Sequence, residues 1–383
     1  MLELGSVIIL GILAQWLAWR IKVPAILPLL IIGLLVGPLS TYWTADGTKL
    51  LEPMWTGDKG LFAGEHLFHF VELAIGLILF EGGMSLKREE IKGVGPAIIN
   101  LITLGSLVTF LGGALMAYFI MELPLDISFL FSGLIIVTGP TVIGPILRNL
   151  NIKRNVSAIL KWEGILIDPI GALVAVLVYE FIHLFHNPEF GSSGNFTGMA
   201  IRQFLTIALE GTSLGFFSAH ALKWLLKRNL VPHYLLTVFT LSFVLAVFVG
   251  SHYLVADSGL LTVVVLGMVI GNIDVPHKKE IAYFGESISI LLIAILFILL
   301  SANIDIKDLM LLMDWRVLIL FGCIVLILRP IGVFLSTRTS DLNNNDKLFI
   351  SWVGPRGIVA AGIASLFGSK LVSEGVPGAE YIT

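Results

Sequence analysis

Asp168 is the residue of this chain with the clearest capacity for chemistry, because it is a carboxylate inside an otherwise apolar stretch. The stretch runs from Ile165 to Val178 and reads ILIDPIGALVAVLV. A charged side chain at the centre of a membrane helix costs about 2.5–3.5 kcal/mol on insertion scales, and residues that carry this cost are as a rule functional. Burial disfavours the ionised carboxylate, so a proton and a cation can compete for it. We predict that Asp168 binds a monovalent cation or a proton.

Two Gly-Pro pairs interrupt apolar segments on either side of Asp168 in the sequence. They are Gly139-Pro140, preceded by Thr138, and Gly354-Pro355. A proline inside a helix removes a hydrogen bond and leaves carbonyl oxygens free. At membrane depth such backbone is tolerated where it is buried in protein or lines a cavity. The alternative for each pair alone is a simple proline kink, but two pairs at corresponding positions favour helices that break to bind an ion.

Oxygen atoms near Asp168 complete the predicted site. Pro169 frees a carbonyl one turn back in the helix, near Gly164 or Ile165. The hydroxyl of Thr138 adds a further oxygen at the first break. Carboxylate, carbonyl and hydroxyl oxygens suit Na⁺, K⁺ or a proton. We therefore predict that Asp168, Thr138 and Gly164 form the ion-binding and proton-binding site.

Glu163 and Arg356 are the other costly charges within apolar segments. Five residues separate Glu163 from Asp168, which rotates the two side chains about 140° apart on a helix, so they are not twin ligands. The least costly arrangement pairs Glu163 with Arg356 as a structural ion pair and leaves Asp168 free to titrate. Lys161 is the competing partner for Glu163, but it is expected to snorkel towards the helix end. Arg329 is expected to pack or snorkel, and the alternatives are a gate or a pair with an acidic group.

The composition indicates a polytopic membrane protein of the all-α class. Of 383 residues, 56% are apolar and 13% are charged, whereas a soluble domain is about 25% charged. The single cysteine, Cys323, excludes an intramolecular disulfide and a thiolate metal cluster. The sequence has no His-Glu-x-x-His, Gly-x-Ser-x-Gly or Walker A motif. We therefore expect neither an enzyme nor a bound cofactor, and no nucleic-acid partner.

Hydropathy predicts about twelve membrane helices, with thirteen expected in the full protein. They cover residues 3–20, 24–39, 66–83, 95–121, 127–148, 156–184, 200–226, 231–250, 256–273, 281–301, 314–336 and 346–368. The connections after odd-numbered helices carry 15 Lys and Arg, against four on the other side. By the positive-inside rule the N-terminus lies outside the cell. The expected location is the plasma membrane, as a multi-pass protein of a bacterial inner membrane.

The two Gly-Pro breaks indicate an inverted repeat. The breaks lie in the fifth and twelfth helices, which correspond if 200–226 is a linker helix between a first repeat at 3–184 and a second at 231–383. The repeats would then enter the membrane from opposite sides. The second repeat lacks the counterpart of the Asp168 helix, so we expect that the sequence is truncated within this repeat.

The motifs in this order resemble the NhaP-type group of monovalent cation/proton antiporters, to which the Na⁺/H⁺ exchangers belong. The resemblance covers nearly the whole chain and rests on RIKVP at 20–24, GLLVGP at 33–38, LFEGG at 79–83, TGPTVIGPILR at 138–148, EGILIDP at 163–169 and GPRGIV at 354–359. It implies a dimerisation half and a core half that move in an elevator-like cycle. It also implies that Asp168 carries cation and proton, that Glu163 pairs with Arg356, and that the protein is a homodimer in the bilayer.

Three positions depart from the pattern of this group. Gly139 replaces an Asp, Ile167 replaces an Asn, and Gly164 replaces a Ser. A less polar site should hold Na⁺ less tightly, so both Na⁺ and K⁺ remain candidates, and a regulatory domain beyond residue 383 remains open. No basic residue lies between Ser287 and Ser301, which favours electroneutral one-for-one exchange. The alternative from another class is a cation channel.

Overall fold

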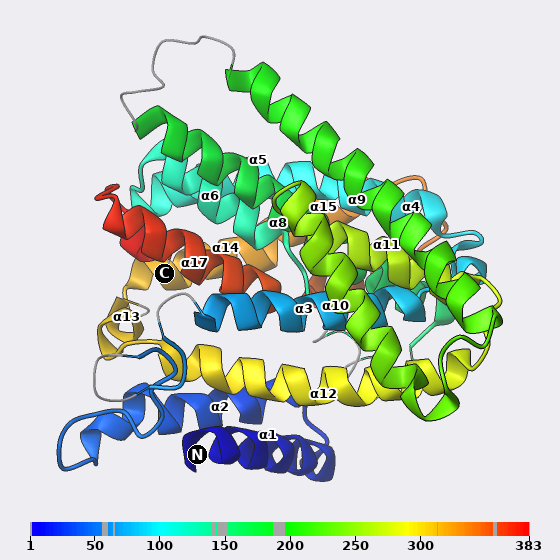
Figure 1. Ribbon diagram of the computed structural model, residues 1–383. Coiled ribbons are helices and arrows are strands. Elements are labelled where there is room, and N and C mark those ends of the chain that lie inside the picture. The colour runs from blue at the N-terminus through cyan, green and yellow to red at the C-terminus, as the bar shows by residue number, and fades with distance from the viewer. Residues whose placement is uncertain are drawn as a thin grey trace.

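The computed structural model describes residues 2–55, 60–63, 66–139, 143, 147, 152–186, 196–311, 313–354 and 358–382. Within these residues the chain is helical, and Met54 and Phe62 form an isolated bridge rather than a strand. The helices lie side by side with the connections gathered at their ends (Figure 1). The prediction of an all-α fold is confirmed.

The helices follow the predicted spans closely. They are α1 (Leu2–Ile21), α2 (Ile26–Val36), η1 (Pro38–Tyr42), α3 (His66–Ser85), η2 (Arg88–Ile91), α4 (Gly95–Asn100), η3 (Leu101–Gly105), α5 (Ser106–Met121), α6 (Leu125–Ile136), α8 (Arg154–His186), α9 (Phe196–Lys227), η4 (His233–Leu235), α10 (Leu236–Leu254), α11 (Gly259–Asn272), α12 (Lys278–Asn303), α13 (Ile306–Leu311), α14 (Trp315–Cys323), η5 (Ile324–Leu328), α15 (Arg329–Ser336), α16 (Asn344–Trp352), α17 (Ile358–Ser373) and η6 (Ala379–Tyr381). Apolar composition over a membrane-spanning length was therefore sufficient to place most of them.

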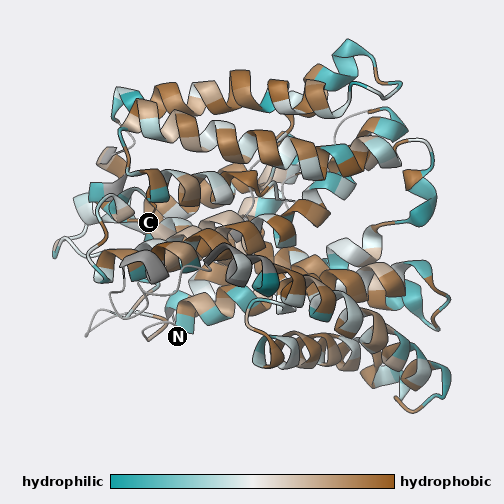
Figure 2. Cartoon of the chain, turned by 90° about the horizontal axis from the view of Figure 1, so that it is seen from above, coloured by the Kyte–Doolittle hydropathy of each residue, from teal (hydrophilic) through white to brown (hydrophobic). Residues whose placement is uncertain are grey.

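Seven helical segments of the described chain are long and apolar enough to cross a membrane. They are Glu3–Ile21, His66–Ser85, Gly95–Met121, Arg154–Ile182, His233–Leu254, Lys278–Asn303 and Trp315–Ser336. Large apolar side chains such as Trp19, Phe119 and Leu209 are exposed on the outer helices. Figure 2 shows hydrophobic residues along the helix bodies and hydrophilic residues at the ends and connections. This pattern fits a lipid environment, while the count of twelve crossings stays a prediction.

Both predicted breaks coincide with helix ends. Helix α6 ends at Ile136, and Val137 turns extended with φ −61° and ψ 121°. Helix α16 ends at Trp352, and α17 begins only at Ile358. Thr138, Gly139 and Gly354 lie in these non-helical segments. Pro140, Pro355 and Arg356 fall outside the described residues.

Two π-helical turns were not predicted. One, η3, lies within the continuous helix 95–121, and the other, η5, lies within the continuous helix 315–336. Such turns carry no strong sequence signal, and they often occur at functional sites. The first of these helices is the fourth predicted helix of the first repeat, and the second is the fourth predicted helix of the second repeat. The repeat boundaries themselves, 3–184 and 231–383, stay predictions.

Helices α3 and α11 pack closely, with direct contact between their backbones. A Cβ atom added to Gly267 would lie 2.3 Å from the Phe80 carbonyl oxygen, and one added to Gly271 would lie 2.4 Å from that of Met84. Small residues allow such approach, and van der Waals contact is a main source of helix association in lipid. A second group consists of α1, α2 and α12, which lie together at one side of the molecule (Figure 1).

Candidate ion-binding site

Asp168 lies in the middle of α8 and is completely buried, with 0% of its surface exposed. Within the described part of the chain, neither oxygen of its carboxyl group has a hydrogen-bond partner. An ionised carboxylate without a partner is very costly in an apolar interior. Among the described residues nothing offsets the charge of the ionised form, so the group is suited to take up a proton or a cation.

The first helix break lies against the turn of α8 that carries Asp168. Gly171, three residues further along α8, would meet Val137 at 2.4 Å if it carried a Cβ atom. A Cβ atom added to Gly133 of α6 would similarly lie 3.3 Å from the Cα atom of Ala175. Residues three apart share a helix face, so these contacts bring the segment that begins at Val137 beside Asp168.

Thr138 follows Val137 and is buried, and its hydroxyl oxygen has no hydrogen-bond partner among the described residues. Two unpartnered polar side chains, Thr138 and Asp168, therefore lie on packed neighbouring elements. Gly164 is buried one turn before Asp168, in a helix that continues through Pro169. The missing N–H of Pro169 leaves the carbonyl one turn earlier without its helical donor. These oxygen donors suit a hard monovalent cation.

Glu163 is also buried in α8, but both of its carboxylate oxygens are engaged. Nη1 of Arg329 donates to one oxygen at 2.6 Å and Nη2 donates to the other at 3.0 Å. The Arg329 side chain is 11% exposed and the Glu163 side chain is 3% exposed. A bidentate, charge-assisted pair of this kind fixes geometry as well as charge. Glu163 therefore ties α8 to α15.

The expectation that Arg329 packs or snorkels is wrong, and the alternative of a pair with an acidic group is the one that the structure shows. The sequence does indicate that Arg329 needs an acidic partner, because it follows the apolar run of η5, but it does not indicate which one. Arg329 also contacts the second break, since a Cβ atom at Gly354 would lie 2.8 Å from its Nε. The predicted pair between Glu163 and Arg356 stays a prediction, because Arg356 lies outside the described residues.

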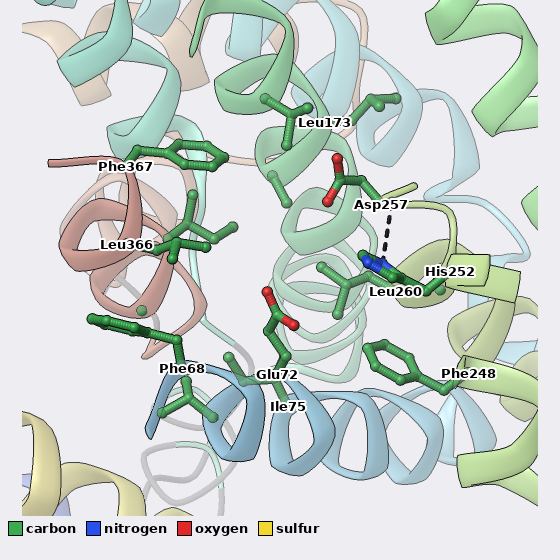
Figure 3. Close-up of a pocket in the computed structure, with 16 residues that line it drawn as sticks. Phe68, Glu72, Ile75, Leu173, Phe248, His252, Asp257, Leu260, Leu366 and Phe367 are labelled. Carbon is green, nitrogen blue, oxygen red and sulfur yellow. Dashed lines mark hydrogen bonds between the residues drawn. The ribbon is translucent and has the colours of Figure 1, made fainter. Parts of the chain in front are cut away.

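A cavity of about 60 Å³ lies beyond Asp168 towards the C-terminal end of α8. Leu173 of α8 lines it, five residues after Asp168, together with Leu366 and Phe367 of α17. Figure 3 shows the carboxyl groups of Glu72, from α3, and of Asp257, from the connection between α10 and α11, pointing into this cavity from different sides.

Asp257 lies in the wall of this cavity, in the connection between α10 and α11. Burial raises the pKa of its carboxyl group, and the nearby His252 and Lys370 oppose this effect. The backbone N–H of Asp257 donates to Nδ1 of His252 at 3.4 Å. The cavity thus combines apolar walls with titratable side chains.

A wider cavity of about 520 Å³ lies on the other side of Asp168. Its walls carry Lys161 of α8 and charged residues of α3, α12 and the connection after α3, among them Glu81, Lys87 and Glu90. Nζ of Lys161 donates to the Ser85 carbonyl at 2.7 Å and lies 3.4 Å from Glu90. Lys161 therefore reaches a polar helix end, as predicted for snorkelling. Asp168 lies between the two cavities along α8.

Comparison with known sequences gives one family for nearly the whole chain. The model of the sodium/hydrogen exchanger transmembrane family matches residues 6–383. Among similar relatives, the probable Na⁺/H⁺ antiporter 2 of Methanocaldococcus jannaschii is 26% identical over 80% of this chain and 74% of its own length. The Na⁺/H⁺ antiporter 1 of the same organism is 25% identical over 99% of this chain and 87% of its own length.

A K⁺/H⁺ antiporter, NhaP of Alkalimonas amylolytica, is 25% identical over 94% of this chain, which spans 58% of that longer protein. Among solved structures, the sodium proton antiporter MjNhaP1 of Methanocaldococcus jannaschii has the same fold, with a TM-score of 0.80. At 23% identity the match covers 99% of this chain and 93% of that chain.

Proposed function

Since this chain belongs to the sodium/hydrogen exchanger family, we propose that it exchanges a monovalent cation for protons across a membrane, with Asp168 as the shared carrier. The observation that carries this proposal is the complete burial of Asp168, with no hydrogen-bond partner for its carboxyl group in the described chain. Its multi-pass helical architecture and its relatives, both Na⁺/H⁺ and K⁺/H⁺ antiporters, point to the same activity.

Competition at one carboxylate couples the two fluxes. The carboxylate crosses the barrier neutralised, either by a proton or by a cation, because the bare charge is too costly in an apolar interior. In either state, the bound proton or cation is released when the site becomes accessible from the opposite side of the membrane. Thr138 and the carbonyl near Gly164 supply oxygen ligands to the cation, and a proton needs neither.

The two cavities beside α8 support alternating access to Asp168. The wide cavity lies beside Lys161, about 10 Å along α8 before Asp168. The narrow cavity begins beside Ala172, about 6 Å along α8 after Asp168. Lys and Arg are concentrated in the connections at the wide end. By the positive-inside rule that end faces the cytoplasm, so the described conformation opens inward and the N-terminus lies outside.

The pair of Glu163 and Arg329 has a structural role in this proposal. It joins the helix that carries Asp168 to the helix beside the second break, so both breaks are held around one carrier. Its charges neutralise each other and leave Asp168 as the group that titrates. The proposed location is the plasma membrane of a bacterium, and the proposed assembly is a homodimer.

The transported cation is Na⁺ or K⁺, and we propose one-for-one, electroneutral exchange. Gly139, Ile167 and Gly164 provide no polar side chain around Asp168, which weakens the case for tight Na⁺ binding. No basic side chain lies between Ser287 and Ser301 of α12. A current or a change of membrane potential during turnover would contradict electroneutrality.

The test uses the protein in liposomes with a trapped pH dye. A proton gradient is imposed, Na⁺, K⁺ or Li⁺ is added in turn, and wild type is compared with Asp168→Asn. Dequenching that requires both a cation and Asp168 is the expected result, and the responding ion is the substrate. Cation conductance that does not saturate and survives Asp168→Asn would indicate the channel function instead.

A further inference from the structure

Three side chains of types that ligate metal ions lie close together, and they are remote in sequence from Asp168 and from both helix breaks. His233 opens η4 in the connection between α9 and α10, and His277 precedes α12. Glu280 lies in the first turn of α12. One potential ligand atom from each residue lies within 4.8 Å of the others, and it is the one such group of three in the described chain.

The side chains already face one another. Nδ1 of His277 lies 2.9 Å from Oε1 of Glu280, and Nε2 of His233 lies 3.7 Å from Oε2 of the same carboxylate. The two imidazole rings have centroids 4.8 Å apart. Ligands of a tetrahedral Zn²⁺ ion, at bonds near 2.0–2.1 Å, are separated by about 3.3 Å. Small side-chain rotations are therefore enough to enclose an ion.

The backbone presents His277 in an unusual way. Its φ is +56°, a left-handed conformation that is uncommon for residues other than glycine. The carbonyl of His277 accepts hydrogen bonds from the N–H groups of Glu280 and Ile281, at 3.0 and 3.2 Å. The start of α12 thus holds His277 and Glu280 on one side of the site, while His233 comes from a separate connection.

The donor set identifies the class of ion. Two imidazole nitrogens and one carboxylate oxygen suit Zn²⁺, Co²⁺, Ni²⁺ or Cu²⁺, whereas Mg²⁺, Ca²⁺ and the alkali ions prefer oxygen ligands alone. The side chains of His233, His277 and Glu280 are 67%, 43% and 50% exposed. An ion can therefore reach them from the aqueous phase, and water can fill a fourth position.

We propose that His233, His277 and Glu280 form a binding site for one divalent transition-metal ion, with Zn²⁺ as the reference ion. The ion joins the α9–α10 connection to the start of α12. This site is separate from the cation site at Asp168, and it does not depend on the proposed transport function.

The test titrates the purified full chain in lipid nanodiscs with Co²⁺, whose visible absorption reports nitrogen ligation, and then displaces Co²⁺ with Zn²⁺. One ion per chain is expected to bind. His233→Ala, His277→Asn and Glu280→Gln should each weaken binding by roughly tenfold or more, at least as much as loss of an outer-shell partner does. Asparagine is chosen at His277 because it tolerates the left-handed backbone.

Two controls keep the result specific. His220→Ala removes another exposed imidazole, on α9, whose Nδ1 lies 2.9 Å from the Phe216 carbonyl oxygen, and it should leave binding unchanged. Asp168→Asn should also leave it unchanged, which separates this site from the transport site. Zn²⁺ should raise the unfolding temperature of wild type, because it binds the folded state, and should not do so in the three variants.

Two outcomes would overturn the proposal. Equal binding in wild type and in all three variants would mean an adventitious ion only, held elsewhere on the protein. Absence of saturable binding below about 1 mM metal, the weak end of specific affinity, would mean that the three side chains are satisfied by one another. Size-exclusion profiles of each variant exclude misfolding as the reason for a loss.

Discussion

Glu163 and Asp168 are two buried carboxylates on one helix, and they differ in what surrounds them. Glu163 is 2% exposed and accepts two hydrogen bonds from Arg329. Asp168 is 0% exposed and has no hydrogen-bond partner in the described chain. Five residues therefore separate a carboxylate that is fixed by an arginine from one that is available to a cation or a proton.

The difference teaches that burial alone does not identify a carrier. A buried charge that is paired and hydrogen-bonded holds elements together, and it resists exchange of its partner. A buried carboxylate without a protein partner can exchange a bound proton for a cation without breaking contacts within the fold. The following predictions test this contrast.

The largest effect is expected from Asp168→Asn, which should abolish cation-dependent proton movement in liposomes. The amide cannot bind a proton or neutralise a cation. Because no hydrogen bond to Asp168 is lost in the described chain, the variant should fold and unfold at a temperature no lower than that of wild type. A folded variant with half the wild-type exchange would contradict the assignment of Asp168 as the carrier.

Arg329→Ala should instead reduce stability, by about 3–5 kcal/mol, because it leaves Glu163 buried and uncompensated. The measurement is the unfolding temperature in detergent, together with the yield of monodisperse protein. A second variant that also carries Glu163→Leu should recover much of the loss.

Arg356→Ala, measured in parallel, shows which arginine supports Glu163. If Arg329 is the partner, the Glu163→Leu substitution rescues Arg329→Ala and not Arg356→Ala. Equal damage in the single and double Arg329 variants would show that the ion pair is not what stabilises this part of the fold.

Gly171→Ala should lower exchange while most of the fold survives. The added methyl group would lie 2.4 Å from Cγ2 of Val137 and 3.2 Å from its backbone nitrogen, so the side chain of Val137 must shift and the segment that leads to Thr138 is pushed away from the Asp168 turn. Overpacking of this kind costs about 1–3 kcal/mol. Gly322→Ala is the matched control, since nothing lies within 4 Å of its added Cβ. The same exchange rate in both glycine variants would show that the approach of α6 to α8 does not shape the site.

Thr138→Val should weaken cation binding by a few-fold, since it removes one neutral hydroxyl ligand, a loss of the order of 1 kcal/mol. Thr138→Ser keeps the hydroxyl and should restore the cation concentration for half-maximal exchange. Identical values for the valine and serine variants would remove Thr138 from the ligand set.

The smallest effect concerns Asp257, one of the titratable residues in the wall of the narrow cavity. Burial raises its pKa, so the folded state binds its proton more tightly than the unfolded state does. Its contribution to stability is therefore full at low pH and falls as pH rises through the raised pKa. Asp257→Asn should flatten this fall and slightly raise the unfolding temperature near pH 8. A steeper pH dependence in the variant would contradict this sign.

Asp168 and the two breaks could be predicted from the sequence because each violates a strong local rule. A carboxylate and two Gly-Pro pairs are conspicuous in apolar helices. The partner of Glu163 could not be predicted in the same way. Arg329 and Arg356 both lie in apolar segments of the second half, and helix periodicity does not tell which of them faces α8.

Other features depended on packing rather than on composition. The π-helical turns η3 and η5 contain ordinary helix-compatible residues, so only the three-dimensional structure locates them. His233 lies in the connection between α9 and α10, whereas His277 and Glu280 lie at the start of α12, and the packing of α10 against α12 brings them together. Sequence spacing gives no sign of either.

Cation binding with proton counting tests the central claim most directly. Calorimetric titration of the purified protein with Na⁺ or K⁺, in buffers of different ionisation enthalpy, gives the number of protons released per cation bound. If the two compete at Asp168, wild type should release protons on binding, approaching one per cation at a pH where the carboxyl group is protonated, and Asp168→Asn should release none. Cation binding by the Asp168→Asn variant with the same proton release would show that another group is the carrier.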